Sequence, residues 1–422
     1  MRLVRGKLWG NRDFLFLWIG QGVSDVGTAV SLVVVPLIAV VYLHANGFEV
    51  GALSAIQWLP WLIIGLPAGV WVDRSRRRLL MLGCDVVRCV LLASVPIIAA
   101  IGTLTLAQLY LVAFGVGFAT VVFQIAYQAY PPTIVDTADL PEANAKLLGT
   151  GSVAQLAGPG LGGLLVQIAR APFALIADSA SYAVSFVTLW LIRTPEPKPQ
   201  AAEREPIRVA IAEGGRFVFR DPLLRTMTIA PAISNIFFGG YSAIEVLFLV
   251  RAVHLAPGSV GLLVGLGSLG SVVGALVARP VSRRYGTARA MWMSSVLTTP
   301  FGLLIPLTER GARLALYVLP GWLILIGILI YNVNVTAFRQ AYCPPAILGR
   351  VVASMRFVLF GAVPLGALAG GALATAIGPR SAILVLLAGN LLSSVVLVLS
   401  PLRHMRDLPS SPTAAVETAA AG

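Results

Sequence analysis

The sequence predicts an all-α membrane protein with twelve transmembrane helices. Of its 422 residues, 57% are hydrophobic and only 12% are charged, whereas a soluble domain has roughly 25% charged residues. The mean hydropathy is +0.86. A helix needs roughly 20 apolar residues to cross a bilayer, and breaks rich in charge, Pro or Gly divide this chain into runs of about that length.

Six apolar runs lie on each side of a polar segment. They cover residues 14–42, 50–71, 79–101, 105–129, 143–169, 172–192, 224–250, 258–281, 290–307, 314–337, 350–377 and 381–400. Two boundaries stay open: the fourth helix could continue past Pro131-Pro132, and the turn between Ala169 and Pro172 is very short.

The polar segment divides the chain into two halves. We expect an N-terminal half over residues 1–192, a linker over 193–222, a C-terminal half over 223–401 and a cytoplasmic tail over 402–422. Closely spaced prolines keep the start of the linker extended. Residues 207–219 alternate between apolar and basic and could form a short amphipathic helix on the membrane surface. The tail is rich in Ala, Ser and Thr, which predicts disorder.

The basic residues predict the orientation in the membrane. The net charge of +13 would suggest nucleic acid in a soluble protein, but short cytoplasmic loops of membrane proteins also collect Lys and Arg. With the N-terminus inside and Arg88 within a span, the opposite loops hold few basic residues, namely Arg170, Arg251, Arg310, Arg313 and Arg380. We therefore expect a multi-pass protein of the plasma (inner) membrane, both termini cytoplasmic, a monomer whose charge faces anionic lipid rather than nucleic acid.

Enzyme chemistry has no support in the sequence. The three cysteines form no disulfide framework and are interpreted as packing residues. His44, His254 and His404 are too scattered for a metal site. The chain also lacks a phosphate-binding Gly-x-x-x-x-Gly-Lys-Ser/Thr loop. We expect no cofactor.

A charged loop joins the second and third spans: Gly69-Val70-Trp71-Val72-Asp73-Arg74-Ser75-Arg76-Arg77-Arg78. It resembles the loop after the second helix of major facilitator superfamily transporters. Two six-helix halves with a cytoplasmic linker are also the layout of that fold, whose pseudo-symmetric halves rock about a central site. The resemblance covers nearly the whole chain and implies transport by alternating access. Arg76 departs from the usual Gly, and the corresponding loop of the second half has Arg283 where Asp would be.

The resemblance gives the loop a role at an inner gate. In the family, the Asp at the position of Asp73 steadies the outward-open state through the N-terminus of the eleventh helix, here near Arg350. A carboxylate beside a helix N-terminus gains about 0.3–1 kcal/mol. The implied latch comprises Gly69, Asp73, Arg74, Arg77 and Arg350. The alternative is that these arginines only set the topology.

The fifth span contains Gly158-Pro159-Gly160-Leu161-Gly162-Gly163, which resembles a motif of drug:proton antiporters. The family pattern also has glycines where this chain has Ala145 and Ala154, so the match is partial. Small residues let helices approach closely, and Pro159 removes one helical hydrogen bond. We expect Gly158, Pro159, Gly162 and Gly163 to form a hinge or a close-packing seam; ordinary helix packing is the alternative.

Three further segments are similar to the branch that contains macrolide and siderophore exporters. They are Asp85-Val86-Val87-Arg88, Leu140-Pro141-Glu142-Ala143-Asn144-Ala145 and Leu348-Gly349-Arg350-Val351. The resemblance implies export of an amphiphilic or cationic small molecule, a drug or a macrolide-like or siderophore-like compound, in exchange for protons. The fourth span lacks the Arg that several antiporter branches place there.

Charges within spans are costly and usually face the interior of the bundle. Asp25 lies eleven residues past Phe14, or about 16 Å into its helix and close to the midplane. Gln21, Ser24 and Thr28 surround it. A carboxyl group there could exchange a proton when substrate enters or leaves, so Asp25 is the expected coupling residue. The alternative is an Asp that only packs helices.

Other polar residues in spans are weaker candidates for proton coupling or substrate binding. Asp85 and Arg88 share a helix face and can pair, as a site or as a self-neutralising structural pair. Asp178 and Glu245 lie toward the outer ends of their helices, and Glu245 could simply reach the interface. Asn235 is the remaining candidate. It could line a polar cavity with Gln57, Gln124, Gln128, Asn332 and Asn334, beside the aromatic residues Trp58, Phe237, Phe238 and Tyr241.

Two alternatives to export remain at this stage. One is an importer or facilitator of the same fold, against which the fifth-helix motif argues. The other is a non-transporting membrane partner or sensor, in which neutralising Asp25 and Asp73 would change only stability.

Overall fold

The computed structural model describes residues 7–65, 67–196 and 207–409. Over these residues the regular structure is entirely helical. Twelve helical segments are long and apolar enough to cross a membrane, which confirms the predicted number of spans. The chain forms two compact units.

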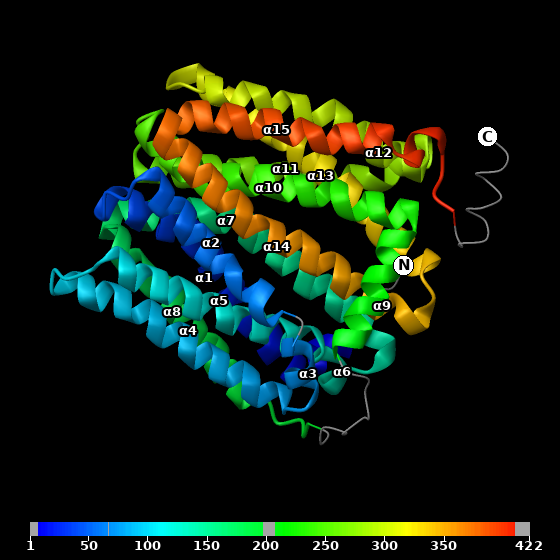
Figure 1. The fold of residues 1–422 in the computed structure, drawn as a ribbon. Helices are drawn as coiled ribbons and strands as arrows, with labels where there is room; N and C mark the ends of the chain where they lie inside the picture. The colour runs from blue at the N-terminus through cyan, green and yellow to red at the C-terminus, as the bar shows by residue number, and fades with distance from the viewer. Residues whose placement is uncertain (1–6, 66, 197–206, 410–422) are drawn as a thin grey trace, which may run out of the picture. The chain divides into compact units, whose positions relative to one another are not determined.

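The first unit comprises Met1–Glu203 and Leu255–Gly265, and its helices are labelled in Figure 1. They are α1 (Arg12–Leu37, extended by a π-helical turn over Ile38–Tyr42), α2 (Gly47–Ile64), α3 (Pro67–Asp73), α4 (Arg77–Ala100), α5 (Leu106–Gln128), α6 (Pro131–Ile134), α7 (Leu140–Ala169) and α8 (Ala171–Leu191). Helix α1 packs against α7 and α8, and α4 packs against α5 and α8.

The second unit comprises Arg204–His254 and Leu266–Gly422. Its helices are α9 (Ile207–Arg220), α10 (Pro222–Arg251), α11 (Pro257–Tyr285, whose first residues belong to the first unit), α12 (Thr287–Thr298, continued as 3-10 helix over Thr299–Leu307), α13 (Ala315–Tyr342), α14 (Pro345–Ile377) and α15 (Pro379–Leu399). Helix α10 packs against α14 and α15.

The second span ends earlier than predicted. We expected it to reach residue 71, but α2 ends at Ile64 and a separate short helix, α3, begins at Pro67. Proline has no backbone N–H and its ring clashes with the preceding turn of a helix. The charged loop motif therefore starts on its own helix.

The two boundaries left open by the sequence are now defined. Helix α5 ends at Gln128, and Pro131 starts the new helix α6, because proline is favoured at a first helical position. Between α7 and α8 only Arg170 lies outside a helix, with φ of 67°. Such a left-handed backbone is uncommon without glycine and makes the very short turn.

The predicted linker helix exists. Helix α9 covers Ile207–Arg220 and packs against α14. Gly214 permits the contact, because a Cβ there would lie within 3 Å of the Arg350 backbone, and Val218 is buried. The start of the linker, residues 193–196, has no regular secondary structure, and its continuation over 197–206 lies outside the described residues. The predicted tail begins with ordered residues, since Pro401–His404 form a short 3-10 helix in which Leu402 is buried, whereas residues 410–422 lie outside the described part.

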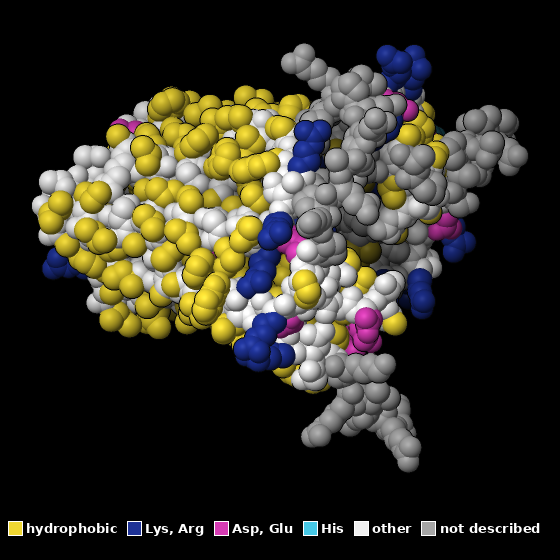
Figure 2. All heavy atoms as spheres, turned by 90° about the horizontal axis from the view of Figure 1, so that it is seen from below, with side chains coloured by type: hydrophobic (Ala, Val, Ile, Leu, Met, Phe, Trp, Pro, Cys, Tyr) yellow, Lys and Arg dark blue, Asp and Glu magenta, His cyan; other side chains and the backbone are white. Residues whose placement is uncertain are grey.

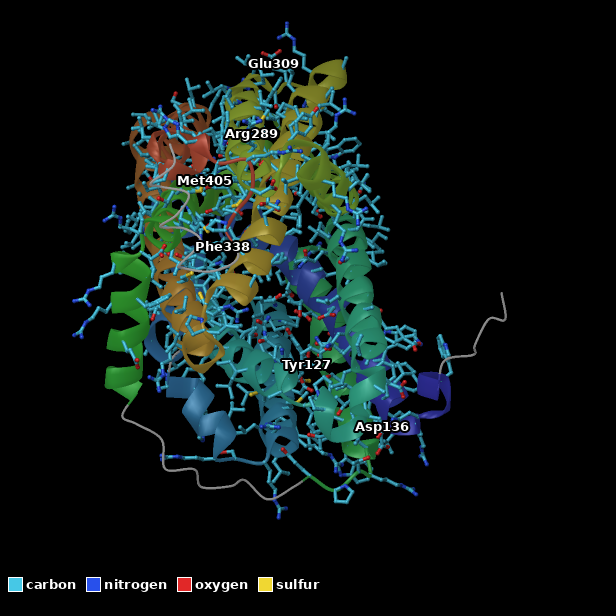
Figure 3. All side chains as sticks on the ribbon, turned by 90° about the vertical axis from the view of Figure 1, so that its right-hand side faces the viewer. Tyr127, Asp136, Arg289, Glu309, Phe338 and Met405 are labelled. Atoms are coloured by element: carbon cyan, nitrogen blue, oxygen red, sulfur yellow. The ribbon has the colours of Figure 1, made fainter. Side chains whose placement is uncertain are left out.

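Asp221 joins the start of α10 to the end of α13. Its carboxylate accepts hydrogen bonds from the backbone N–H groups of Leu223 and Leu224, both at 2.9 Å, and from the Tyr342 hydroxyl at 2.5 Å. Phe338, labelled in Figure 3, stacks on Tyr342 with ring centroids 4.5 Å apart. The acidic side chain thus satisfies orphan N–H groups of the helix and anchors a second helix.

Hydrophobic side chains cover much of the surface, as one face shows in Figure 2. Most of the Lys and Arg side chains on this face lie on the right-hand side of Figure 2, where the apolar surface ends, and others lie at its left-hand end. Leu148, Ile168 and Leu276 are among the large apolar side chains more than 70% exposed. A soluble monomer rarely exposes contiguous apolar surface on this scale, whereas lipid is a suitable solvent for it.

All three thiols are free, as expected, and two of them are buried. Cys343 follows the last residue of α13. Burial, together with the nearby Asp221 carboxylate, raises the pKa of the Cys343 thiol. This thiol therefore stays protonated and serves in packing.

Glycines bring α10 and α14 into backbone contact. A Cβ at Gly366 would lie within 3 Å of the Ile236 backbone, and one at Gly370 within 3 Å of the Gly240 backbone. Close approach of this kind is how membrane helices associate, since lipid tails are as apolar as their side chains.

We predict that Gly370→Leu lowers the melting temperature of the detergent-solubilised protein, because an overpacked side chain costs about 1–3 kcal/mol. Gly321→Leu is the matched control, since a Cβ at Gly321 on α13 would meet no atom within 4 Å. Equal melting temperatures for the two variants would show that the α10–α14 seam is not tight.

Candidate functional site

A buried arginine organises the interior of the first unit. Arg88 of α4 is 3% exposed, and its guanidinium lies 4.1 Å from the Phe123 ring centroid and 4.2 Å from that of Tyr182. It forms an ion pair with Asp85, one turn earlier, as the spacing predicted. Ser185 of α8 donates to the same carboxylate at 2.7 Å. The predicted pair is therefore present and tied to a second helix.

Asp178 links α8 to α1. Its buried carboxylate accepts hydrogen bonds from Ser31 of α1 and, at 3.1 Å, from Ser181. One turn on, the Tyr182 hydroxyl lies 2.9 Å from the Thr28 hydroxyl. Both connections join the two helices that pack most extensively in this unit.

Asp25 occupies the middle of α1, as predicted. Gln21 Nε2 donates to Asp25 Oδ1 at 2.6 Å, whereas Oδ2 faces α7, where a Cβ on Gly151 would lie 3.3 Å away. Asp25 is half-buried, unlike the fully buried Asp85 and Asp178. It is therefore the most accessible of the three acids.

One arginine interacts with three carboxylates. Arg88 attracts Asp25, Asp85 and Asp178 electrostatically, yet its single charge can neutralise only one of them. An uncompensated carboxylate is costly in a site with little water. This arrangement can bind a proton, because protonating one acid removes part of the excess negative charge.

Glu245 of α10 is held by two tyrosines. The hydroxyls of Tyr241 and of Tyr317 on α13 both donate to Glu245 Oε1, at 2.7 and 2.6 Å. The structure thus corrects the alternative that Glu245 simply reaches the interface, because the bond from Tyr317 holds it against α13. The bond from Tyr241 was predictable from the sequence, because Tyr241 and Glu245 lie four residues apart on one helix.

Arg77 of the predicted inner gate anchors helices within the first unit. Its guanidinium donates to the Ala129 carbonyl at 3.0 Å, just past the end of α5. Arg78, which the sequence analysis did not single out, donates to the carbonyls of Leu189 and Trp190 in the last turn of α8. Cations favour these positions because the last carbonyls of a helix lack partners.

The other residues of the predicted gate differ in how far the structure describes them. The side chain of Asp73 lies outside the described part of the structure. Arg74 is exposed, and a Cβ on Gly69 would meet open space. In the second unit, Arg350 forms an ion pair with Glu213 of α9.

The glycine motif of α7 packs against α1. Helix α7 runs unbroken through Pro159. A Cβ on Gly158 would lie within 3 Å of Ala29, and one on Gly162 would lie 2.9 Å from the Val30 carbonyl oxygen. The structure thus shows a close-packing seam at these glycines.

Gly163 makes a second close approach in the same unit. A Cβ on it would lie 2.8 Å from the Cα of Gly261 and from the carbonyl oxygen of Pro257, in the first turns of α11. The motif therefore presents small residues to two helices at once.

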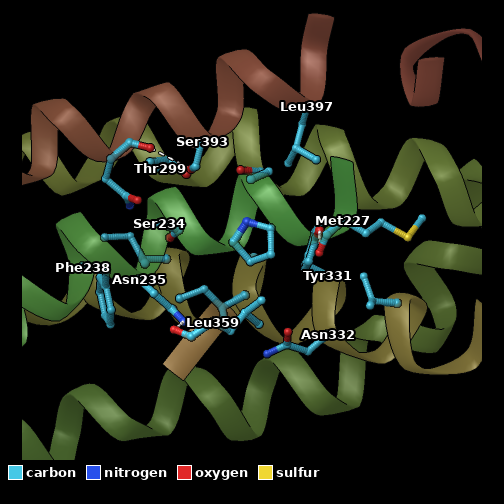
Figure 4. Close-up of a pocket in the computed structure, with 18 of the residues that line it drawn as sticks. Met227, Ser234, Asn235, Phe238, Thr299, Tyr331, Asn332, Leu359, Ser393 and Leu397 are labelled. Atoms are coloured by element: carbon cyan, nitrogen blue, oxygen red, sulfur yellow. Dashed lines mark hydrogen bonds between the residues drawn. The ribbon is translucent and has the colours of Figure 1, made fainter. Parts of the chain in front are cut away.

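The second unit contains a cavity of about 450 Å³ between α10, α13, α14 and α15, lined by both polar and apolar side chains. Figure 4 shows Ser234, Asn235 and Phe238 from α10, with Asn332 from α13, among the side chains that line it. Asn235 donates to the Leu359 carbonyl at 2.9 Å. Asn235, Asn332 and Phe238 had been proposed from the sequence as cavity-lining residues.

Other predicted lining residues have different positions. Asn334 is buried and donates to the Ser282 hydroxyl at 2.9 Å, and Tyr241 binds Glu245. Conversely, Arg339 and Arg356 line the cavity, although the sequence analysis did not single them out. Their position in the last turns of α13 and the first half of α14 was a signal that basic charge lies close to the spans.

The chain matches one family model, described as transmembrane secretion effector, over residues 9–420. It is 25% identical over 400 residues to the multidrug efflux pump Tap of Mycolicibacterium fortuitum, covering 92% of this chain and 96% of Tap. It is 26% identical over 415 residues to the enterobactin exporter EntS of Escherichia coli, covering 95% of each. These likenesses confirm the resemblance to drug and siderophore exporters.

Solved structures support the fold. The crystal structure of the nucleoside transporter NupG matches with a TM-score of 0.75 at 13% sequence identity, covering 92% of this chain and 98% of NupG. At this identity the likeness concerns the arrangement of the helices alone, and it confirms the predicted fold class.

We predict that the stability effects of Asp85→Leu and Arg88→Met are strongly non-additive. Removing one partner leaves the other charge buried and costs about 3–5 kcal/mol, whereas replacing both by apolar residues costs far less. The melting temperatures of the two single variants and the double variant measure this coupling. Additive losses would mean that the two charges are stabilised independently of each other.

Proposed function

We propose that this chain, which belongs to the transmembrane secretion effector family of the major facilitator superfamily, exports an amphiphilic small molecule by alternating access. The chain is a secondary transporter. The observation that carries the proposal is the family match over nearly the whole sequence, with a multidrug efflux pump and a siderophore exporter among its relatives.

The cavity of the second unit supports a small-molecule substrate. Its volume of about 450 Å³ falls within the range of roughly 300–1,000 Å³ found for ligand pockets. Amide, hydroxyl and aromatic side chains line it, including Asn235, Asn332 and Phe238. Such a mixture suits a molecule with both polar and apolar parts.

We propose that export is coupled to proton entry through Asp25. The support is the excess of carboxylates around Arg88 and the accessibility of Asp25. Asp25 is half-buried and is bonded through one oxygen to Gln21, whereas Asp85 and Asp178 are fully buried and hydrogen-bonded. When Asp25 is protonated, the charge imbalance around Arg88 decreases. A carboxyl group that changes charge in this way can link proton binding to the state of the transporter.

The remaining proposals concern the setting of the transporter. The chain is a multi-pass membrane protein, and we propose that both termini are cytoplasmic because the basic residues follow the positive-inside pattern. We further propose that it acts as a monomer in the plasma (inner) membrane, needs no cofactor and catalyses no covalent reaction.

Two segments receive proposed roles in the transport cycle. We propose that the loop containing Gly69 and Asp73 forms an inner gate and that the glycine seam of α7 lets α1 shift against it. The seam is suited to sliding because its glycines present few side-chain atoms to α1.

We predict that adding a substrate to inside-out vesicles containing the protein releases protons from the vesicle lumen, and that Asp25→Asn abolishes the release. A pH-sensitive dye reports the release while macrolides, lipophilic cations and catechol siderophores are added in turn. Asp136→Asn, which neutralises an exposed carboxylate outside the spans, should release protons normally.

The same assay separates the alternatives. Accumulation of labelled compound without proton movement would identify a facilitator. Proton release that persists in Asp25→Asn would place coupling on another residue. If no compound moves and no proton is released, a non-transporting membrane protein becomes the better explanation.

We predict that Asp73→Asn slows export about two- to fivefold, which corresponds to losing the 0.3–1 kcal/mol that a carboxylate gains at a helix N-terminus. Initial rates are compared in vesicles that contain equal amounts of inserted protein. Arg74→Gln tests whether the neighbouring exposed charge matters as well. Full export by Asp73→Asn would refute the role of Asp73 at the gate.

A further inference from the structure

The cavity of the second unit carries two arginines. Arg339 of α13 and Arg356 of α14 both line it, so two positive charges share one cavity. The Nη1 atom of Arg339 lies 3.9 Å from the sulfur of Met355, the residue before Arg356. No carboxylate appears among the described residues that line the cavity.

The described carboxylates of this unit are engaged elsewhere. Each has a hydrogen bond or ion pair outside the cavity: Glu213 with Arg350, Asp221 with Tyr342, Glu245 with Tyr241 and Tyr317, Glu309 with Arg313, and Asp407 with Arg406. The positive charge of the cavity is therefore uncompensated by the part of the unit that the structure describes.

Two buried polar atoms in the cavity also lack partners. The Nε atom of Arg339 and the Oδ1 atom of Asn390 are inaccessible and form no hydrogen bond with the described residues. Asn390 is 3% exposed and lines the cavity from α15. Buried polar groups are nearly always hydrogen-bonded. The Nε atom of Arg88 also lacks a partner, but Asp85 balances the charge of Arg88, whereas no described acid lines the cavity of Arg339, so a bound molecule could supply one.

In the first unit, by contrast, carboxylates neutralise the buried arginine. Arg88 pairs with Asp85 and is attracted by Asp25 and Asp178. Among the described residues, the Arg339 guanidinium has the Met355 thioether and the Thr336 hydroxyl, at 3.4 Å, as partners and no carboxylate. The contrast argues against a purely structural role for the second pair of arginines.

The remaining lining indicates the body of the ligand. Asn235, Asn332 and Ser393 offer neutral hydrogen-bonding groups, and Phe238 and Tyr331 offer aromatic surface. Figure 4 shows these five side chains contributed by α10, α13 and α15 around one space. An aromatic molecule with hydroxyl or carbonyl groups suits this surface.

We infer that this cavity binds an organic anion, with its acidic group against Arg339 and Arg356 and its aromatic body against Phe238 and Tyr331. The inference rests on the proposed export function and narrows its substrate class from amphiphilic or cationic molecules to amphiphilic anions. Guanidinium groups are suited to this role because they bind carboxylates and similar acids in bidentate fashion.

The test compares two dyes that share a xanthene body but differ in charge. Fluorescein is anionic and rhodamine 123 is cationic, and fluorescence anisotropy measures the binding of each to the full-length protein in detergent. We expect fluorescein to bind more tightly than rhodamine 123. Arg339→Gln and Arg356→Gln should each raise the dissociation constant of fluorescein about tenfold, as expected for losing one charge-assisted hydrogen bond.

Arg283→Gln is the matched control, since it removes an exposed arginine of the same unit that does not line the cavity. It should leave fluorescein binding unchanged. Melting temperatures of all variants show whether they fold. If Arg339→Gln is unstable, Arg356→Gln alone tests the proposal. Arg356 is exposed, so its replacement leaves no buried polar group without a partner.

Three results would overturn the anion site: tighter binding of rhodamine 123, absence of fluorescein binding, or equal fluorescein affinity in all variants. The two arginines would then serve only to set the membrane topology. The vesicle assay distinguishes these results from failure of the export proposal. Fluorescein binding without any vesicular export would refute export and retain the site. Export of cations that is unaffected by Arg356→Gln would retain export and refute the site.

Discussion

The interior of a bilayer contains no water, and the structure depends on this constraint. Backbone groups must therefore be satisfied within helices, and all twelve candidate spans are helical. Lipid also supplies no hydrophobic force between helices, so small residues must let backbones meet. Gly158 and Gly162 do this against α1, and Gly366 and Gly370 do it against α10. Any charge inside such a bundle then needs a partner.

The two units differ in how their buried charges are balanced. In the first, Arg88 has more carboxylates around it than it can neutralise. In the second, Arg339 and Arg356 line a cavity without an acid among its described residues. According to our proposals, the first unit binds a proton and the second unit binds an organic anion. Proton entry and anion export would then both be driven by an interior-negative potential, worth about 2.3 kcal/mol per charge at 100 mV.

Some features of the candidate site were predictable because they are local. Asp85 and Arg88 pair because they are three residues apart on one helix, and the depth of Asp25 follows from counting along α1. The contacts of Asp178 with Ser31 and of Glu245 with Tyr317 were not predictable. Each joins helices far apart in the sequence, and its formation depends on how both helices are rotated about their axes.

The sequence by itself determined the number of membrane helices and their approximate limits, because bilayer thickness requires runs of about 20 apolar residues and charged or proline-containing breaks separate them. It also identified the family through short motifs. Only the tertiary structure decided that Arg77 binds the end of α5 and that Arg339 and Arg356 share a cavity with Asn390. The physical reason is that hydropathy specifies where a helix lies in lipid, whereas packing between distant helices selects which side chains meet.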